Sequence, residues 1–270
     1  MRICFIGGGN MATALIGGML GRGYSSSKIR VVEINAENRV RMHEEFAVRA
    51  VDNLAEGIAK CSTIVLAVKP QQLREVALQL APLLQKNQLL LSIAAGIRAS
   101  DLARWANTPA VVRAMPNTPA LVRCGMTGLF ALPEVTAEQR EQAQSILSAV
   151  GKIMWLKDEA MLDAVTAISG SGPAYVFYFI EAMQAAAVEL GLSEHDARML
   201  SLETFLGASK LAETSADDVS VLRQRVTSKN GTTERALLSL EANAVKQHII
   251  AAAHAAATRS REMGDELGKA

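Results

Sequence analysis

Cysteine and histidine are scarce in this sequence, and their placement excludes several kinds of site. Three cysteines and four histidines occur among the 270 residues. Cys4, Cys61 and Cys124 lie far apart, and the histidines show no ligand spacing, so neither a disulfide framework nor a zinc site is indicated. We interpret the cysteines as reduced packing residues, which suits a cytoplasmic protein, and we expect no bound metal.

An excess of one charge is also missing. Lysine and arginine together number 28 and aspartate and glutamate 27, which leaves a formal net charge of +1. A balanced chain creates no field that would attract nucleic acid or an anionic membrane. The expected partner is therefore a small molecule.

No apolar run reaches the roughly 20 residues needed to cross a bilayer. The run from Ala174 to Ile180 is strongly apolar, but Glu181 ends it. The stretch from Arg2 to Gly21 superficially resembles a secretory signal, yet its cleavage would delete the first expected strand. We therefore expect an intact N-terminus and no membrane span. Half of the residues are apolar, and the length suits about two domains with sizeable cores.

The N-terminal residues fit a strand, a phosphate-binding turn and a helix. The apolar run Ile3 to Ile6 leads into G-x-G-x-x-A, where Gly7, Gly9 and Ala12 take the three small-residue positions of a dinucleotide fingerprint. Gly7 permits a sharp turn, and Gly9 permits close approach of a diphosphate to the backbone. The start of the helix would offer its free N–H groups to that diphosphate. A purely structural glycine turn is the alternative, and the flanking strand and helix favour the nucleotide.

The second expected strand, Ile29 to Glu33, ends in an acid. Glu33 lies 21 residues after Ala12, close to where the fingerprint places an acid that accepts hydrogen bonds from the adenosine ribose. Its charge would repel a 2′-phosphate and favours NADH, whereas Asn35 and Arg39 just beyond would suit that phosphate. A solvated strand-end glutamate is the alternative. The preference between NADH and NADPH thus stays open.

Residues 1–158 alternate strands and helices, which predicts a Rossmann-like dinucleotide-binding domain with antiparallel or mixed pairing at the sheet edge. Further strands are expected at Phe46 to Val51, Thr63 to Val68, Gln88 to Ile93, Ala110 to Ala114, Thr127 to Ala131 and Lys152 to Leu156. Ligands of such sheets lie beyond the carboxyl ends of the strands. The segments that follow three of these strands are therefore cofactor candidates, namely Ala67, Val68, Lys69 and Pro70, then Ala94, Ala95 and Gly96, then Asn117. Lys69 has a second interpretation as a surface charge.

Residues 159–270 are expected to form an all-α domain. Helices are predicted from Pro173 onward and then over residues 194–215, 218–225, 232–241 and 245–267. Their alanine-rich surfaces, such as Ala251 to Ala257, predict a two-fold dimer through this domain, with a self-contained bundle as the alternative.

A second glycine-containing turn runs from Val226 to Glu234. A turn with hydroxyls directly before a helix presents N–H and O–H groups to a small carboxylate. Alternatively, Thr232 only caps the helix. The sequence pattern leaves these two interpretations nearly balanced.

Six segments, in this order, resemble pyrroline-5-carboxylate reductases. They are GGGNMA near the N-terminus, LAVKPQ at 66–71, SIAAGI at 92–97, RAMPNTPA at 113–120, SGSGPAYVF at 169–177 and VTSKNGTTERAL at 226–237. Because they keep the family's order and span nearly the whole chain, the resemblance is specific. It implies the last step of proline biosynthesis, the reduction of L-1-pyrroline-5-carboxylate to L-proline by NADPH or NADH in a homodimer or larger homo-oligomer.

The resemblance also assigns site residues. It implies that Gly7, Gly9, Asn10 and Met11 hold the diphosphate, and that Ala67 to Pro70 and Ala94 to Gly96 lie along the cofactor, with Asn53 on the adenosine side. Ser228, Gly231, Thr232 and Thr233 would receive the substrate carboxylate, and Thr233 would also hydrogen-bond the ring nitrogen. The family's turn often reads S-P-G-G, whereas this chain has Lys229 and Asn230 in place of the proline and the first glycine. Ser171 and Ala174 are secondary candidates, for which tight helix packing is the favoured interpretation.

The implied chemistry needs little from the protein. A protonated cyclic C=N bond is already electrophilic, so catalysis reduces to placing the nicotinamide about 3 to 3.5 Å from the imine carbon. β-Hydroxyacid dehydrogenases are the nearest enzymatic alternative, but they place a catalytic lysine where this chain has Val176. A nucleotide-sensing module without catalysis is the other alternative.

Overall fold

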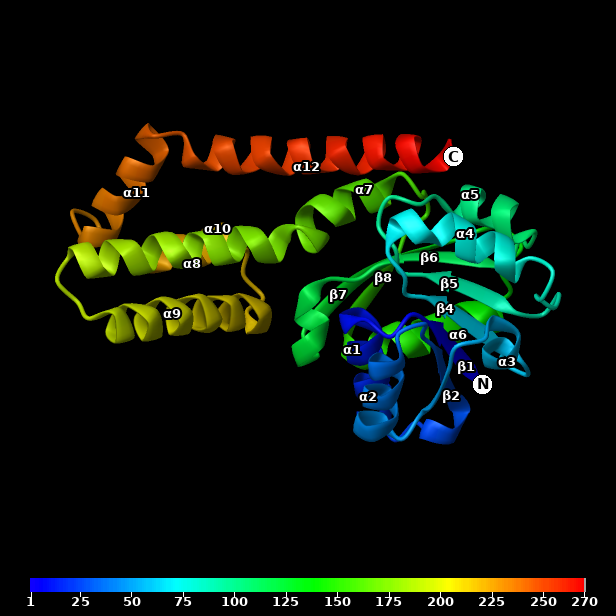
Figure 1. The fold of residues 1–270 in the computed structure, drawn as a ribbon. Coiled ribbons are helices and arrows are strands. Elements are labelled where there is room, and N and C mark those ends of the chain that lie inside the picture. Colours follow the sequence, from blue (N-terminus) through cyan, green and yellow to red (C-terminus); the bar gives the residue numbers. More distant parts are fainter. Residues whose placement is uncertain (270) are drawn as a thin grey trace. The chain divides into compact units, whose positions relative to one another are not determined.

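The structure is a computed structural model that describes residues 1–269, and its N-terminal part contains one eight-stranded sheet (Figure 1). The strand order is β3-β2-β1-β4-β5-β6-β7-β8, and neighbours are parallel except β6 and β7. The strands are β1 (Ile3–Ile6), β2 (Ile29–Val32), β3 (Arg49–Val51), β4 (Thr63–Leu66), β5 (Leu89–Ser92), β6 (Val111–Met115), β7 (Gly125–Ala131) and β8 (Gly151–Trp155). The prediction of a Rossmann-like domain with a mixed sheet edge is confirmed.

Helices fill the connections and make up the C-terminal part. They are α1 (Asn10–Gly21), α2 (Ala36–Phe46), α3 (Leu54–Ile58), α4 (Pro70–Leu80), α5 (Ala99–Ala106), α6 (Ala137–Leu147), α7 (Met161–Val165), α8 (Gly172–Glu189), α9 (Glu194–Thr214), α10 (Val219–Arg225), α11 (Thr232–Ala242) and α12 (Val245–Gly268). A π-helical turn, Thr166–Gly170, joins α7 to α8 and was not expected from the sequence. None of the described helices is both long enough and apolar enough to span a membrane.

Both faces of the sheet are covered by helices, which explains the continuously apolar strands. Along β1, Ile3 and Phe5 pack in one buried cluster with α1, α2 and α6, and Cys4 and Ile6 pack in another with α3, α4 and α5. All four residues of β1, β4 and β5 are buried. A strand buried on both sides has no polar face, which is the pattern that the sequence showed.

Capping side chains set where several helices begin. Asn35 accepts a hydrogen bond from the N–H of Asn38 at the start of α2, and Asn53 accepts one from Glu56 at the start of α3. Thr136 and Gln139 form a reciprocal capping box at α6. Each bond satisfies a helical N–H group that has no partner within the helix.

The chain divides into two compact units. One comprises Met1 to Ser171 together with the residues from Ala256 onward, and the other comprises Gly172 to Ala255. From the sequence we predicted a boundary after residue 158, with residues 159–270 as one domain. That division stays a prediction. Because α12 spans residues 245–268, it contributes residues to both units.

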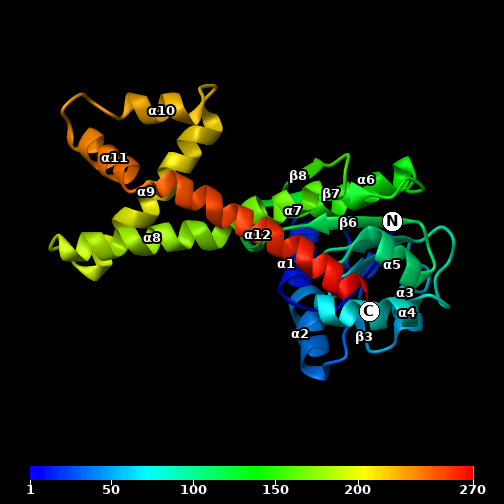
Figure 2. The ribbon, with the colours of Figure 1, turned by 90° about the horizontal axis from the view of Figure 1, so that it is seen from above.

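The second unit is helical, as predicted. Within it, α8 and α9 pack against each other (Figure 2), and many large apolar side chains on these helices are exposed in the single chain. Phe177 and Tyr178 of α8 and Leu206 of α9 are each more than 60% exposed. Apolar surface of this extent is typical of an interface between subunits.

Candidate functional site

The glycine turn after β1 has the backbone that the fingerprint requires. Gly7 has φ +98°, and its N–H donates to the carbonyl of Val32 at 2.8 Å. A Cβ added at Gly7 would lie 2.7 Å from the carbonyl oxygen of Ala67, so only glycine fits. Gly9 is the N-cap of α1, has no capping side chain, and would meet no heavy atom within 4 Å of an added Cβ. The start of α1 is therefore open to an anion.

A cavity of about 500 Å³ lies beside this turn, at the carboxyl ends of β1, β2 and β4. Seven of the predicted cofactor residues line it, namely Gly7, Gly9, Glu33, Asn35, Ala67, Val68 and Lys69. Asn10 and Met11 open α1 directly after Gly9, and Pro70 is the first residue of α4. Asn53 caps α3 between Asp52 and Leu54, which both line the cavity. The structure therefore gathers most of the predicted residues at one edge of the sheet.

Glu33 faces the glycine turn. Its Oε2 accepts a 2.9 Å hydrogen bond from the N–H of Gly8, and its Oε1 accepts one of 2.9 Å from the N–H of Asn35. Both donors are backbone groups, so the carboxylate is held in place at the cavity wall. Each carboxylate oxygen of Glu33 thus has a backbone partner, and its contact with a ribose stays a prediction.

Two arginines near Glu33 are already engaged. Arg39 donates through Nη1 to the carbonyls of Glu33 and Ile34, and its Nη2 lies 3.7 Å from Asp52. Arg41 donates through Nη2 to the carbonyl of Gly8 at 2.9 Å. Gly8 and Arg41 could not be found from the sequence, because no local pattern links a residue on α2 to the turn after β1.

The other predicted cofactor segments adopt tight turns. Ala94 and Gly96 are buried, and Gly96 has φ +73° in the loop between β5 and α5. Asn117 donates through Nδ2 to the carbonyl and the hydroxyl of Ser169 at 3.1 Å, and its Oδ1 accepts from the N–H of Met126. The amide of Asn117 thus ties the loop after β6 to neighbouring segments, and its contact with a cofactor stays a prediction.

The second glycine turn, in the helical unit, forms the start of α11. The N-cap is Gly231, and no side chain caps the helix, so the alternative that Thr232 is the capping residue is wrong. Asn230 has φ +61°, and its N–H donates to Oε2 of Glu234 at 2.7 Å. Asparagine tolerates this left-handed backbone better than most residues. That tolerance explains how asparagine can occupy this position without glycine's conformational freedom.

The same turn leaves donors at the helix start. The N–H of Gly231 donates to the carbonyl of Ser228 at 3.0 Å, which closes the turn and leaves the first N–H groups of α11 beyond it. A Cβ at Gly231 would lie 2.5 Å from the Ser228 hydroxyl oxygen, so the serine side chain folds back over this position. Thr232 is exposed and Thr233 is half-buried. An anion of carboxylate size fits such an uncapped helix start.

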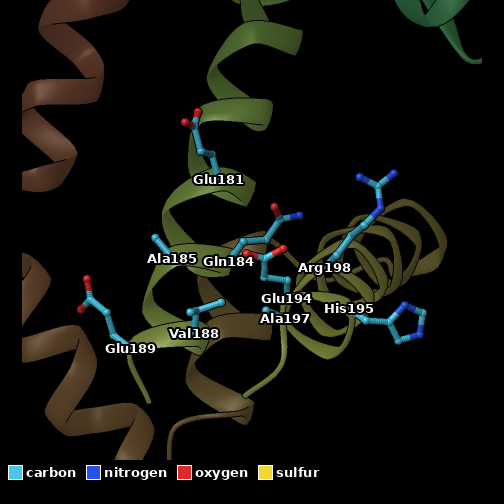
Figure 3. A pocket seen from close by; sticks show the side chains of 9 residues that line it. All are labelled: Glu181, Gln184, Ala185, Val188, Glu189, Glu194, His195, Ala197 and Arg198. Atoms are coloured by element: carbon cyan, nitrogen blue, oxygen red, sulfur yellow. The ribbon is translucent and has the colours of Figure 1, made fainter. Parts of the chain in front are cut away.

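A further hollow of about 710 Å³ lies between α8 and α9 (Figure 3). Glu181 and Glu189 come from α8, and Glu194, His195 and Arg198 come from α9. Its lining carries more acidic than basic groups, which does not suit an anionic cofactor or substrate. Among residues 1–269, no group of three or more His, Cys, Asp or Glu side chains is arranged to hold a metal ion.

Comparisons with known proteins find relatives of both the sheet-containing part and the helical part of the chain. A family model described as pyrroline-5-carboxylate reductase dimerisation matches residues 159–263, and one described as NADP oxidoreductase, coenzyme F420-dependent, matches residues 2–96. A pyrroline-5-carboxylate reductase of Pseudomonas aeruginosa is 49% identical over 99% of this chain and 98% of that protein. One of Haemophilus influenzae is 43% identical over 97% of each.

Solved structures show the same likeness. A pyrroline-5-carboxylate reductase from Coxiella burnetii matches with a TM-score of 0.92 and 39% identity, covering 97% of this chain and 98% of that one. A pyrroline carboxylate reductase of Plasmodium falciparum with NADP bound matches with a TM-score of 0.87 and 30% identity, covering 98% of both. The likeness thus extends over both units of the chain.

Proposed function

The chain belongs to the pyrroline-5-carboxylate reductase family, and from this premise we propose how its residues hold the two reactants. It is an oxidoreductase that reduces L-1-pyrroline-5-carboxylate to L-proline with NADPH or NADH, the last step of proline biosynthesis. It forms a homo-oligomer. We further propose a cytoplasmic location, which the free and buried thiols of Cys4 and Cys61 support.

We assign the dinucleotide to the cavity beside the glycine turn. The open space at Gly9 and the uncapped start of α1 suit a diphosphate, and Glu33 faces the same cavity with a fixed carboxylate that suits ribose hydroxyls. Ala67 to Pro70 continue this surface along the carboxyl end of β4. When bound, NAD(P)H supplies the hydride that reduces the C=N bond.

We assign the substrate carboxylate to the start of α11. The observation that carries this assignment is the helix start at Gly231 without a capping side chain. Backbone N–H groups of Thr232 and Thr233 would bind the carboxylate, with the Ser228 hydroxyl beside them. The Thr233 hydroxyl would steady the ring nitrogen as it becomes an amine.

The residues so assigned act by positioning. A protonated imine needs no strong acid, so a helix start that fixes its carboxylate and a turn that fixes the cofactor are sufficient. Orientation of this kind is worth up to roughly 7 to 11 kcal/mol of the barrier. A β-hydroxyacid dehydrogenase would also need a base, and Val176 provides none.

One spectrophotometric assay tests the function. We expect the protein to oxidise NADH or NADPH when pyrroline-5-carboxylate is added. A sensing module would bind the nucleotide without consuming it, and that result would overturn the proposal. A crystal soaked with both reactants tests the assignment separately, because a substrate carboxylate found away from Ser228 to Thr233 would exclude the α11 site.

A further inference from the structure

The end of α12 packs directly on the turn between β5 and α5. A Cβ added at Gly96 would lie 3.1 Å from Cβ and 3.3 Å from Cε of Met263, and 3.5 Å from Cδ1 of Leu267. Gly96 is buried, and Leu267 is half-buried against the apolar cluster that includes Ala94 and Ile97. The bare backbone of the turn therefore lies in van der Waals contact with a helix about 170 residues further along the chain.

Polar contacts hold the same helix end in place. Arg98, the N-cap residue of α5, forms an ion pair with Asp265 at 2.5 Å, and Arg104 donates to the carbonyl of Gly268 at 2.9 Å. One turn earlier, the Ser260 hydroxyl donates to Asp163 at 2.6 Å. Figure 2 shows the end of α12 beside α5. These three contacts, all within the first unit, hold the helix end against α5 and α7.

The other flank of the turn is held by Glu159. Its Oε1 accepts hydrogen bonds from the N–H of Ala99 at 2.7 Å and from the buried Arg113 of β6 at 2.9 Å. The start of α5 thus lies between Glu159 on one side and Asp265 on the other. Within the turn, the N–H of Ala94 donates a long hydrogen bond of 3.4 Å to the Ser92 hydroxyl, which is weak support for this backbone.

We propose that the last turns of α12 position the Ala94 to Gly96 turn for hydride transfer, with Met263, Asp265 and Arg98 as positioning residues. The inference rests on the proposed function and on the implication of the family resemblance that this turn lies along the cofactor. The turn follows β5 at the carboxyl edge of the sheet, where ligands of such folds bind. A shift of the helix end would displace this backbone, and a misplacement of about 1 Å lowers a rate by up to about 100-fold.

The experiment compares two carboxylates on neighbouring positions of α12. Asp265→Asn removes the ion pair with Arg98, whereas Glu266→Gln removes a pair with Arg259 that lies within α12 itself. We expect kcat of Asp265→Asn to fall about tenfold while KM for pyrroline-5-carboxylate changes less than about twofold, because the α11 site is untouched. Glu266→Gln should keep wild-type kinetics.

Conservative variants separate positioning from simple stabilisation. Asp265→Glu and Met263→Leu should restore most of the kcat that Asp265→Asn and Met263→Ala lose, with all assays run well below each variant's Tm. Unchanged kcat in both Asp265→Asn and Met263→Ala would overturn the inference, even if their Tm values fall. A tenfold loss of kcat in Glu266→Gln would also overturn it.

Failure of the inference and failure of the proposed function give different results. If wild-type protein oxidises NADH with pyrroline-5-carboxylate and the α12 variants have the same kcat as wild type, only the inference is wrong. If wild-type protein shows no such oxidation, the proposed function is wrong. In that case NADH affinity, measured by quenching of protein fluorescence, still tests the helix contact, because a displaced turn should weaken binding in Asp265→Asn and not in Glu266→Gln.

Discussion

The N–H of Gly8 donates a 2.9 Å hydrogen bond to Oε2 of Glu33, which joins the glycine turn to the residue that follows β2. Arg41 donates to the carbonyl of the same Gly8 at 2.9 Å. The N–H and the carbonyl of Gly8 are therefore each bound by one acidic or basic side chain. The shape of the glycine turn therefore depends on two residues that lie 25 and 33 positions further along the chain.

We expect the charge of Glu33 to set the preference between NADH and NADPH. Glu33→Ser removes a carboxylate that would repel a 2′-phosphate, so the ratio of kcat/KM for NADPH to that for NADH should rise about tenfold, equivalent to about 1.4 kcal/mol. Steady-state kinetics with both nucleotides measure it. Glu37→Ser, an exposed acid in the first turn of α2, is the matched control and should leave the ratio unchanged. No gain with NADPH in Glu33→Ser would contradict this account of the carboxylate.

Gly7 and Gly9 should respond differently to alanine. Gly7→Ala forces φ +98° on a residue with a Cβ and brings that atom within 2.7 Å of a backbone oxygen, so the free energy of unfolding should fall by about 1–3 kcal/mol or more. Gly9→Ala meets no atom within 4 Å. It should cost less than about 1 kcal/mol of stability, yet weaken NADH binding because the methyl group occupies the space assigned to the diphosphate. Urea unfolding and NADH titration of each variant distinguish the two, and normal NADH affinity in Gly9→Ala would count against the assignment.

Thr233 should matter for turnover more than for cofactor binding. Thr233→Val keeps the side-chain shape and removes the hydroxyl, so kcat should drop at least about tenfold, in line with the loss of a hydrogen bond to a charged group of about 1.5–3 kcal/mol. The dissociation constant for NADH should stay nearly constant. Thr214→Val is the control, because this hydroxyl at the end of α9 donates to the carbonyls of Lys210 and Leu211 in its own helix. Wild-type kinetics in Thr233→Val would remove this residue from the site.

The three thiols should differ in reactivity. Burial raises the pKa of the Cys4 thiol, with the nearby Cys61 adding to the effect, and burial also raises the pKa of Cys61. A raised pKa leaves little thiolate, which is the reactive form. Iodoacetamide at pH 8 should therefore modify only Cys124, the exposed cysteine, in the folded protein and all three in guanidinium chloride. Mass spectrometry of peptides identifies the sites, and rapid alkylation of Cys4 in the folded protein would refute the prediction.

The ion pair at the end of α12 should give a pH-dependent stability. The hydrogen bond and the charge of Arg98 lower the pKa of Asp265 below its ordinary value of 3.8, and Lys269 adds a smaller effect in the same direction. Asp101 and Glu159 also face Arg98. A carboxyl whose pKa is lowered by folding stabilises the protein above its unfolded pKa and loses that contribution as the pH falls through the folded value.

Because the pKa of Asp265 is lowered, acid should weaken the stabilisation that its charge provides. The difference in free energy of unfolding between wild type and Asp265→Asn should be constant from pH 7 to about pH 5 and should shrink below pH 3.8. Urea unfolding at four pH values suffices. A difference that grows on acidification would show that Asp265 does not stabilise the fold through its charge.

The sequence alone determined the features that depend on near neighbours along the chain. The apolar runs Ile3 to Ile6 and Thr63 to Val68 predicted buried strands, because a strand covered on both faces keeps no polar side. Gly7, Gly9 and Ala12 predicted the glycine turn and the helix α1 that follows it. The ordered segments shared with the reductases also identified the family.

Only the tertiary structure decided which distant residues support these local elements. The engagement of Asn117 by Ser169, the hold of Glu33 and Arg41 on Gly8, and the packing of Met263 on Gly96 join residues 25 to 167 positions apart. The hydrophobic periodicity and motif spacing of the sequence do not predict such contacts, because these contacts form only when the sheet and helices pack together. The sequence also left open whether Thr232 caps α11, because a capping contact depends on the folded turn. In the structure the N-cap of α11 is Gly231, and no side chain caps the helix.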